Sequence, residues 1–430
     1  MAVTWRAAVL AALGLPVVLL VPATGTVLLW TLLVVVACGV DVALAASPRQ
    51  VGVRRDVPSS ARLTEPATST LTLSHLGRRR LRAVVRDAWP PSAGARDDRH
   101  TVDVAPGEGT RVRTVLLPTR RGDAHADRVT VRTVGPLGLA GRQASLTVPG
   151  RLRVLPEFAS RRHLPSRLAR LKELDGRAAV QVRGPGTEFD SLREYVIGDD
   201  VRSIDWRATA RRSDVVVRTW RPERDRRVLI VLDTGRTSAV RVLDAPRIDA
   251  SIEAALLLAA LATKAGDRVE LLVFDRRVRG RVASATGPRV MAAFADTLAL
   301  AQPALLETDW PGVVAQVRER LSQRALVVLL TALDPAAIEQ GLLGVVGQLT
   351  DRHQVVLASV ADPEVDALRA DRSSTAALFD AAAAERVGLE RAAAALRLRQ
   401  RGAEVLEALP DDLAPRLADS YLALKAAGRL

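Results

Sequence analysis

The sequence is poor in cysteine and in aromatic side chains. Of its 430 residues one is cysteine, and phenylalanine, tryptophan and tyrosine together make up 3%. A single cysteine excludes a disulfide framework and a cysteine-rich zinc site. Aromatic residues that could stack on bases are few, and no nucleic-acid recognition module is present. We therefore rank nucleic-acid binding last among the candidate functions and expect no nucleic acid as a partner.

The common signatures of enzymes are missing as well. The sequence contains no G-x-x-x-x-G-K-[ST] phosphate loop, no H-E-x-x-H zinc motif and no G-x-S-x-G nucleophile elbow. Its five histidines are far apart, with no spacing typical of metal ligands. We therefore expect a non-enzymatic protein without catalytic residues.

A long apolar stretch lies at the beginning of the sequence. From Ala7 to Ala46 the only ionisable side chains are those of Cys38 and Asp41. The stretch is too long for the apolar region of a signal peptide, which has about 7–15 residues. A Pro-Ala-Thr-Gly turn divides it, and the second part, Thr26 to Ala46, would reach about 31 Å as a helix, enough to cross a bilayer core. Residues 1–46 therefore predict a two-helix transmembrane hairpin, with a cleaved signal peptide before a secreted protein as the alternative.

Positive charge follows the apolar stretch. Residues 47–230 carry 37 Lys and Arg against 21 Asp and Glu, whereas residues 231–430 carry 24 against 26. Arg6 lies before the hairpin and Arg54 and Arg55 follow it, so the positive-inside rule predicts that both ends face the cytoplasm. Arginines near the inner leaflet would gain about 1 kcal/mol each from anionic lipid. We expect a two-span protein of the cell (inner or plasma) membrane, with soluble domains in the cytoplasm and membrane lipid as a partner.

Residues 47–155 predict a β-sandwich. Four short stretches have the alternation or the β-branched content of strands, and Gly, Pro and Asp cluster between them. These stretches are 69–74, 81–86, 111–117 and 128–133. No residue there suggests catalysis.

Residues 227–430 predict a doubly wound α/β domain with a mostly parallel sheet. Apolar strands alternate with apolar-periodic helices, beginning with a continuous apolar run from Arg227 to Asp233. Ligands of such sheets bind beyond the carboxyl ends of the strands. We therefore expect residues 233–238, 308–309 and 331–334 to lie together on one rim.

The most distinctive part of the sequence lies between these two domains, from Gly186 to Arg211. It reads GTEFDSLREYVIGDDVRSIDWRATAR, and related pieces occur at 121–122, 135–139, 217–223 and 232–235. Together they resemble domain-of-unknown-function family 58, membrane proteins with a von Willebrand factor A-like domain. The resemblance covers essentially the whole chain. It implies that residues 156–226 are the family signature and a linker and that residues 227–430 are the von Willebrand A-like domain.

The resemblance also implies a partner, a MoxR-type AAA+ ATPase. The ATPase would supply the nucleotide chemistry, and this chain would be a membrane-anchored interaction or scaffold protein in the assembly or maturation of an unknown client protein. The signature residues expected to contact a partner are Glu188, Asp190, Arg193, Tyr195, Asp199, Asp200, Arg202, Asp205, Trp206 and Arg207.

The von Willebrand A resemblance implies a degenerate metal-ion-dependent adhesion site. Such sites use D-x-S-x-S after the first strand, a threonine from a later loop and an aspartate after the fourth strand, and their oxygen ligands suit Mg²⁺. Gly235 and Ala332 stand at two of these positions and depart from the pattern. The matching residues are Asp233, Thr237 and Thr308, with Asp334 as a substitute for the last aspartate. We favour the interpretation that these side chains form only local hydrogen bonds, and keep Mg²⁺ as a hypothesis.

A metal-dependent hydrolase is the alternative to a scaffold protein. Its metal would be held by carboxylates of the signature segment, as in two-metal hydrolysis. These carboxylates are Glu188, Asp190, Asp199, Asp200 and Asp205. Arginines are interleaved with them and would neutralise them, so we favour ion pairing or partner docking for this segment.

Overall fold

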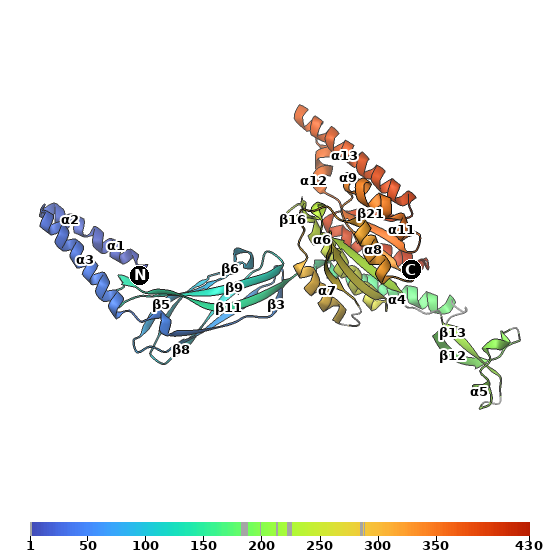
Figure 1. Ribbon diagram of the computed structural model, residues 1–430, viewed down its shortest axis with the longest axis horizontal. Helices are drawn as coiled ribbons and strands as arrows, with labels where there is room; N and C mark the ends of the chain where they lie inside the picture. Colours follow the sequence, from blue (N-terminus) through green and yellow to red (C-terminus); the bar gives the residue numbers. More distant parts are fainter. Residues whose placement is uncertain are drawn as a thin grey trace. The chain divides into compact units, whose positions relative to one another are not determined.

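The computed structural model of the protein describes residues 2–181, 188–197, 199–211, 214–221, 226–283, 287 and 289–430. The side chains of residues 175–181, 188–191 and 219–221 are outside the description. The chain forms two compact units, residues 1–157 and residues 158–430 (Figure 1).

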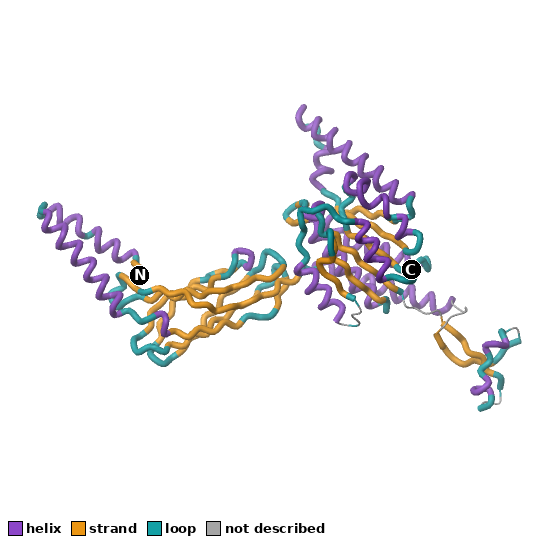
Figure 2. The backbone as a smooth tube through the Cα atoms, in the orientation of Figure 1, coloured by secondary structure: helices purple, strands orange, loops and turns teal. Residues whose placement is uncertain are grey.

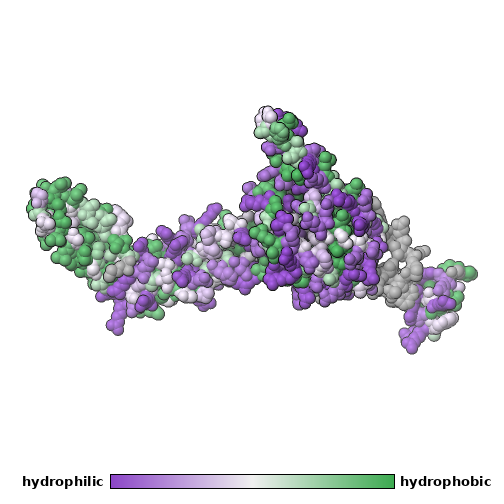
Figure 3. All heavy atoms as spheres, turned by 45° about the horizontal axis from the view of Figure 1, so that its top comes forward, coloured by the Kyte–Doolittle hydropathy of each residue, from purple (hydrophilic) through white to green (hydrophobic). Residues whose placement is uncertain are grey.

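Three apolar helices begin the first unit. They are α1 (Trp5–Ala12), α2 (Gly14–Leu20) and α3 (Thr24–Leu44). In a continuous helix the ring of Pro16 would clash with the carbonyl of the residue four positions earlier. That residue is Ala12, and α1 ends there. The other two helices pack on α3, where the Trp30 indole N–H donates a hydrogen bond to the Leu10 carbonyl at 3.2 Å. The outer surface of these helices is apolar (Figure 3).

Helix α3 is the part of the described chain that is long and apolar enough to cross a membrane. The apolar segment Trp5–Leu20 before it is shorter. An apolar N-terminal helix of spanning length, predicted from the sequence, is therefore confirmed, and the second span stays a prediction.

Two sheets form the rest of the first unit (Figure 2). The five-stranded sheet has the order β3 (Ser60–Arg62), β11 (Gln143–Leu155), β9 (Gly122–Thr133), β5 (Leu81–Ala88) and β7 (Arg99–Val104). The four-stranded sheet has the order β2 (Val51–Asp56), β4 (Ala67–His75), β8 (Gly109–Leu116) and β6 (Ala95–Arg96). A short pair, β1 (Ala2–Val3) with β10 (Ala140–Gly141), joins the N-terminus to this part. Alternate residues such as Leu71 and Leu73 of β4 and Leu81 and Val85 of β5 share one core between the sheets, and the four predicted strands lie in β4, β5, β8 and β9.

Arg55 is buried inside this part of the molecule rather than free to meet lipid. It shares the inward face of β2 because it stands opposite buried Leu71. Its side chain and that of Asp87 are both 0% exposed and form an ion pair at 2.7 Å. Asp87 also accepts hydrogen bonds from Ser69 and from the Trp89 indole, at 2.7 and 3.0 Å. Arg55, one of the arginines that follow the predicted hairpin, is therefore used in a buried ion pair, and the cytoplasmic orientation stays a prediction.

A six-stranded sheet organises the second unit. Its order is β18 (Val278–Val282), β17 (Arg268–Phe274), β14 (Arg227–Asp233), β19 (Leu326–Leu330), β20 (Gln354–Val360) and β21 (Glu404–Ala408). All neighbours pair in parallel except β18, which is antiparallel to β17. The continuous apolar sequences of β14, β19 and β20 follow from burial of both faces of the sheet.

Helices cover both faces of this sheet (Figure 2). One core contains residues of α4 (Leu164–Gln181), α6 (Arg247–Lys264), α7 (Arg289–Leu300) and α14 (Pro410–Ala426). The core on the other face contains residues of α8 (Trp310–Arg320), η6 (Ile338–Leu342), α11 (Gly347–Thr350) and α13 (Thr375–Gln400). Short helices α9 (Pro335–Ala337), α10 (Leu343–Val345) and α12 (Pro363–Ala370) complete the unit.

The signature segment forms a small two-stranded sheet of its own. Strand β12 (Glu188–Glu194) pairs antiparallel with β13 (Val216–Arg221). Between them lie the helical turns η4 (Val201–Ser203) and α5 (Trp206–Thr209).

Candidate functional site

The carboxyl ends of β14 and β19 meet at the point where the strand order reverses. The chain passes from β14 to β17 on one side of β14 and later returns to β19 on its other side. Doubly wound sheets bind their ligands in the crevice that such a reversal leaves. Asp233 is the last residue of β14 and Thr331 directly follows β19. The structure thus brings together two parts of the rim that the sequence predicted.

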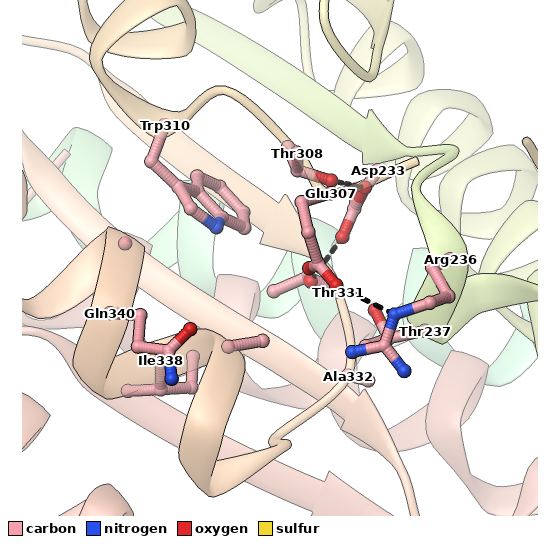
Figure 4. Close-up of a pocket in the computed structure, with 12 residues that line it drawn as sticks. Asp233, Arg236, Thr237, Glu307, Thr308, Trp310, Thr331, Ala332, Ile338 and Gln340 are labelled. Carbon is pink, nitrogen blue, oxygen red and sulfur yellow. Dashed lines mark hydrogen bonds and ion pairs between the residues drawn. The ribbon is translucent and has the colours of Figure 1, made fainter. Parts of the chain in front are cut away.

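Asp233 lies at the floor of this crevice. The residue is 3% exposed. Its Oδ1 accepts hydrogen bonds from the Thr308 hydroxyl at 2.5 Å and the Gly235 N–H at 2.7 Å. Its Oδ2 accepts one from the Thr331 hydroxyl at 2.6 Å (Figure 4). All three donors are uncharged, so they orient the carboxylate without neutralising it.

Burial raises the pKa of Asp233 above its ordinary value. The three hydrogen bonds oppose this rise, and the nearby charge of Asp275 adds to it. The pKa of Asp275, which follows the neighbouring strand β17, is shifted in the opposite direction. Burial alone would raise its pKa, but an ion pair with Arg279 at 2.6 Å and backbone N–H donors outweigh burial and lower the pKa. Of these two buried carboxyl groups, Asp275 is thus paired with a cation and Asp233 is held by neutral donors.

A pocket of about 200 Å³ opens above Asp233 (Figure 4). Its walls are Asp233, Arg236, Thr237, Glu307, Thr308, Trp310, Thr331, Ala332, Ala337, Ile338, Gln340 and Gly341. At the rim, Arg236 Nε and Glu307 Oε1 form an ion pair at 2.6 Å, and both side chains are more than half exposed. Part of the wall is η6, a π-helical turn, and such turns are frequent at functional sites.

Gly235 is required for the contact between Asp233 and Thr308. A Cβ built on Gly235 would overlap the Thr308 hydroxyl oxygen and come within 3.0 Å of Asp233 Oδ1. The glycine that departs from the D-x-S-x-S pattern therefore leaves room for Thr308 to donate directly to the carboxylate. This is a physical reason for the departure.

Three of the four residues predicted as metal ligands line the pocket, and the fourth, Asp334, caps a helix. Asp233 and Thr308 touch each other, and Thr237, on η5 (Arg236–Ala239), lines the same pocket. Asp334 instead begins helix α9, where its Oδ1 accepts a hydrogen bond from the Ala337 N–H at 2.9 Å. Strand β19 ends at Leu330, so the chain has already turned toward α9 when it reaches Asp334.

The predicted rim included Thr331, but not its role as a donor to Asp233. Several other residues that line the pocket were not predicted, among them Glu307, the partner of Arg236, and Trp310. Glu307 and Trp310 flank a threonine and an aspartate in a loop, and no sequence periodicity marks them.

The carboxylates of the signature segment serve local structure. Asp199 forms a bidentate ion pair with Arg193, at 2.5 and 2.7 Å. Asp205 begins α5, accepts two backbone N–H bonds at 3.0 Å, and pairs with Arg218 at 2.8 Å. Asp200 begins η4 in the same way, with a 3.0 Å bond from the Arg202 N–H.

These contacts lower the pKa of two signature carboxyl groups. For Asp199 the main cause is the hydrogen bond from Arg193, followed by the Val196 N–H. For Asp205 it is the Ala208 N–H, followed by Arg218. Both side chains are therefore ionised and already paired. Among the described residues no group of three or more His, Cys, Asp or Glu could hold a metal ion.

The remaining predicted signature residues are mostly exposed. Trp206 is 66% exposed, and Arg202 and Arg207 lie on the same small module. Tyr195 is half-buried and its N–H pairs with the Val215 carbonyl at 2.8 Å. The backbone of Glu188 and Asp190 is in β12, and their side chains lie outside the described part of the structure.

Two solved structures show distant similarity to parts of this chain. The C-terminal part of native alpha-2-macroglobulin from Escherichia coli aligns with a TM-score of 0.21 and 18% identity, over 26% of this chain and 18% of that one. The CARDB domain of the PF1109 protein from Pyrococcus furiosus aligns with a TM-score of 0.16 and 16% identity, over 23% of this chain and 91% of that one. Values this low support no assignment.

Sequence comparison finds mycobacterial relatives. Uncharacterized protein Rv1480 of Mycobacterium tuberculosis (strain H37Rv) and uncharacterized protein Mb1516 of Mycobacterium bovis are each 27% identical over 185 residues, or 42% of this chain. The matched region spans 57% of the length of these relatives. The family model described as "Protein of unknown function DUF58" matches residues 191–405, half of the chain. The matched range includes most of the signature segment and every residue of the Asp233 pocket, and the chain therefore belongs to the DUF58 family.

Proposed function

We propose that the protein is a membrane-anchored, non-enzymatic binding protein that presents the Asp233 pocket to a partner protein. One observation carries this proposal. A buried carboxylate without a cationic partner is costly, and such groups occur at functional sites. Among the residues that the structure describes, Asp233 has no cationic partner, and it stands where doubly wound sheets bind ligands.

We further propose that the α/β unit is a von Willebrand factor A-like domain, as the sequence resemblance implies, with Asp233 at its binding rim. The single antiparallel strand β18 at one edge and the helices on both faces support this resemblance. In such domains the rim at the carboxyl ends of the strands is the binding surface. The same rim would bind the partner here.

The anchor is proposed to be a two-span hairpin of the cell membrane, with both ends in the cytoplasm. Two arginines support this orientation. Arg142 donates to the carbonyl of Val42 at 2.9 Å and Arg79 to that of Ala43 at 2.5 Å, both in the last turn of α3. Positive side chains at a helix C-terminus complement the helix dipole, and positive charge favours the cytoplasmic side. Membrane lipid would be the surrounding partner.

The protein partner is proposed to be a MoxR-type AAA+ ATPase, with an unidentified client. The signature module offers a second contact surface for it, since Ile197 is 96% exposed and Trp206 66% exposed. Large exposed apolar side chains mark interaction surfaces, and tryptophan is frequent among the residues that dominate binding energy.

Mg²⁺ at the Asp233 rim remains a hypothesis that the resemblance implies. The pocket lining has two carboxylates, Asp233 and Glu307, and hydroxyl groups from Thr237, Thr308 and Thr331. Glu307 is already paired with Arg236. Ala332 supplies no further carboxylate. This donor set fits Mg²⁺ poorly, because few charged oxygens are available to replace its waters.

The hydrolase alternative receives less support. Its candidate carboxylates Asp199 and Asp205 are paired with arginines, and Asp200 forms a helical cap. A carboxylate used in this way is not free to bind a metal.

Affinity capture tests the proposed function. The full chain in detergent micelles is immobilised and incubated with a MoxR-type AAA+ ATPase of the same organism, with and without ATP. We expect a complex that Asp233→Asn weakens at least tenfold. Asp380→Asn is the matched control, since Asp380 is an exposed aspartate on α13 and the charge change is the same. If no complex forms in either nucleotide state, the partnership is wrong.

A further inference from the structure

The hydrogen-bonding roles of the hydroxyl groups around Asp233 are set by their contacts with its carboxylate. Thr308 and Thr331 each donate their single hydroxyl proton to the carboxylate. A hydroxyl whose proton is committed in this way has only acceptor lone pairs left for a ligand. Both residues line the pocket, so its floor presents acceptors.

Asp233 itself keeps room for one more donor. A carboxylate has about four acceptor positions. Oδ1 receives two protein donors and Oδ2 receives one. The acceptor position that is left belongs to Oδ2, beside Thr331.

The net charge of the pocket lining is negative, which also favours a ligand that donates hydrogen bonds. Its charged lining residues are Asp233, Glu307 and Arg236. Arg236 is paired with Glu307 at the rim, and the pair leaves the negative charge of Asp233 uncompensated. A ligand that brings one positive charge would balance the site.

One wall of the pocket is the indole of Trp310 (Figure 4). The residue is 4% exposed, and Gly341 fits closely against the ring, because a Cβ built on Gly341 would approach Trp310 Cδ1 to 2.5 Å. Aromatic faces attract ammonium and guanidinium groups, more strongly when water is excluded. A pocket of about 200 Å³ also exceeds the space that a bare ion fills.

We propose that this pocket accepts the charged end of a lysine or arginine side chain of the partner protein, with Asp233 as its counter-ion, Thr308 and Thr331 as acceptors and Trp310 as a wall. The inference rests on the proposed function and names the chemistry of the partner. It reverses the polarity of a metal-ion-dependent adhesion site, in which a metal recruits an acidic partner residue.

The departures from the adhesion pattern favour this reversal. At position 235 glycine replaces a hydroxyl ligand and admits Thr308 to the carboxylate. At position 332 alanine replaces an acid. A single carboxylate balances one positive charge of a side chain, whereas a divalent ion would keep an excess charge in a buried site.

Labelled peptides test the inference. Each peptide is a short Gly-Ser chain with a fluorescein at its N-terminus, an amide at its C-terminus and one central residue, which is arginine, lysine, norleucine or aspartate. Fluorescence anisotropy is measured with the full chain in detergent micelles, once in EDTA and once in Mg²⁺. We expect the arginine or lysine peptide to bind in EDTA at least tenfold more tightly than the norleucine peptide. Asp233→Asn should abolish this difference and Asp380→Asn should preserve it, with unfolding midpoints recorded to show that both variants are folded.

Two results would overturn the inference. One is equal binding of the basic and norleucine peptides. The other is binding of the aspartate peptide that requires Mg²⁺, which would restore the metal-bridged interpretation. Neither result touches the proposed function if the ATPase complex still depends on Asp233. If Asp233→Asn leaves that complex intact, the proposed function is wrong whatever the peptides do.

Discussion

The carboxylate of Asp41 occupies the space in which a side chain on Gly135 would stand. It lies on the apolar helix α3 and accepts backbone N–H bonds from Leu137, Leu139 and Ala140, at 2.8, 2.7 and 2.8 Å. The end of the proposed membrane anchor is thereby fixed to the loop between β9 and β10. Three backbone N–H groups converge on this one side chain, and they would be left without this acceptor if it moved away.

Breaking this contact should loosen the first unit. Gly135→Ala would push Asp41 away from the loop, and we expect it to lower the free energy of unfolding by about 2–4 kcal/mol. Gly39→Ala on the same helix is the matched control, because a Cβ there meets nothing within 4 Å. Thermal unfolding of the detergent-solubilised chain, with protease sensitivity of residues 134–140, is the measurement. Equal midpoints for the two variants would contradict the role of this contact.

The buried ion pair of the first unit predicts a large loss of stability. Asp87→Ala leaves Arg55 charged, buried and without its carboxylate, and we expect a loss of about 3–5 kcal/mol. Asp103→Ala removes a carboxylate from an exposed pair with Arg80, and we expect a much smaller loss of stability, because water screens exposed pairs. Denaturant unfolding followed by circular dichroism compares the two. Similar losses of stability in the two variants would show that burial does not increase the contribution of the Arg55–Asp87 ion pair.

Asp233→Asn should stabilise the α/β unit at neutral pH while it weakens the complex with the partner. Asparagine has nearly the same shape, can still accept from Gly235 and Thr308, and can donate to the Thr331 hydroxyl. Because burial raises the folded-state pKa of Asp233, its contribution to stability is fully present below the unfolded-state pKa and is lost as the pH rises through the folded-state pKa. The stability of the variant relative to the wild type should therefore increase as the pH rises from about 4 toward about 7, above the ordinary aspartate pKa. Unfolding midpoints at several pH values test this, and a gap that stays constant with pH would contradict it.

The exposed tryptophan of the signature module should matter for binding and not for folding. Trp206→Ala removes a side chain that is 66% exposed, so we expect a change in stability below about 0.5 kcal/mol. If the module docks on the ATPase, the loss in affinity should reach about 2 kcal/mol, the range of dominant interface residues. Phe379→Ala on α13, 73% exposed, is the control. Loss of binding in both variants, or in neither, would remove the module from the interface.

The sequence predicted the rim but not the contacts within it. Parallel strands have their carboxyl ends on one edge, which is enough to bring Asp233 and Thr331 near each other. That Gly235 admits Thr308 to the carboxylate depends on a close approach of two loops, which no periodicity encodes. The expectation for Asp334 assumed a longer strand, whereas the strand ends at Leu330 and α9 begins.

Long-range pairs were the least predictable part. The sequence marks Asp41 as a lone acid in an apolar stretch and 135–139 as a separate motif, but Leu137, which donates to Asp41, lies 96 residues away from it in the chain. Arg55 entered the positive-inside prediction for its charge alone. Its place is decided by register, since it stands opposite Leu71 on the inward face of its sheet.

The most direct test of the central claim is the dissociation constant of the full-length chain and its ATPase partner, measured for the wild type, Asp233→Asn and Asp380→Asn in the same detergent. The account predicts at least a tenfold weaker complex for Asp233→Asn, with an unfolding midpoint no lower than that of the wild type, and an unchanged constant for Asp380→Asn. An Asp233→Asn variant that binds as tightly as the wild type would contradict the assignment of the pocket as the binding site.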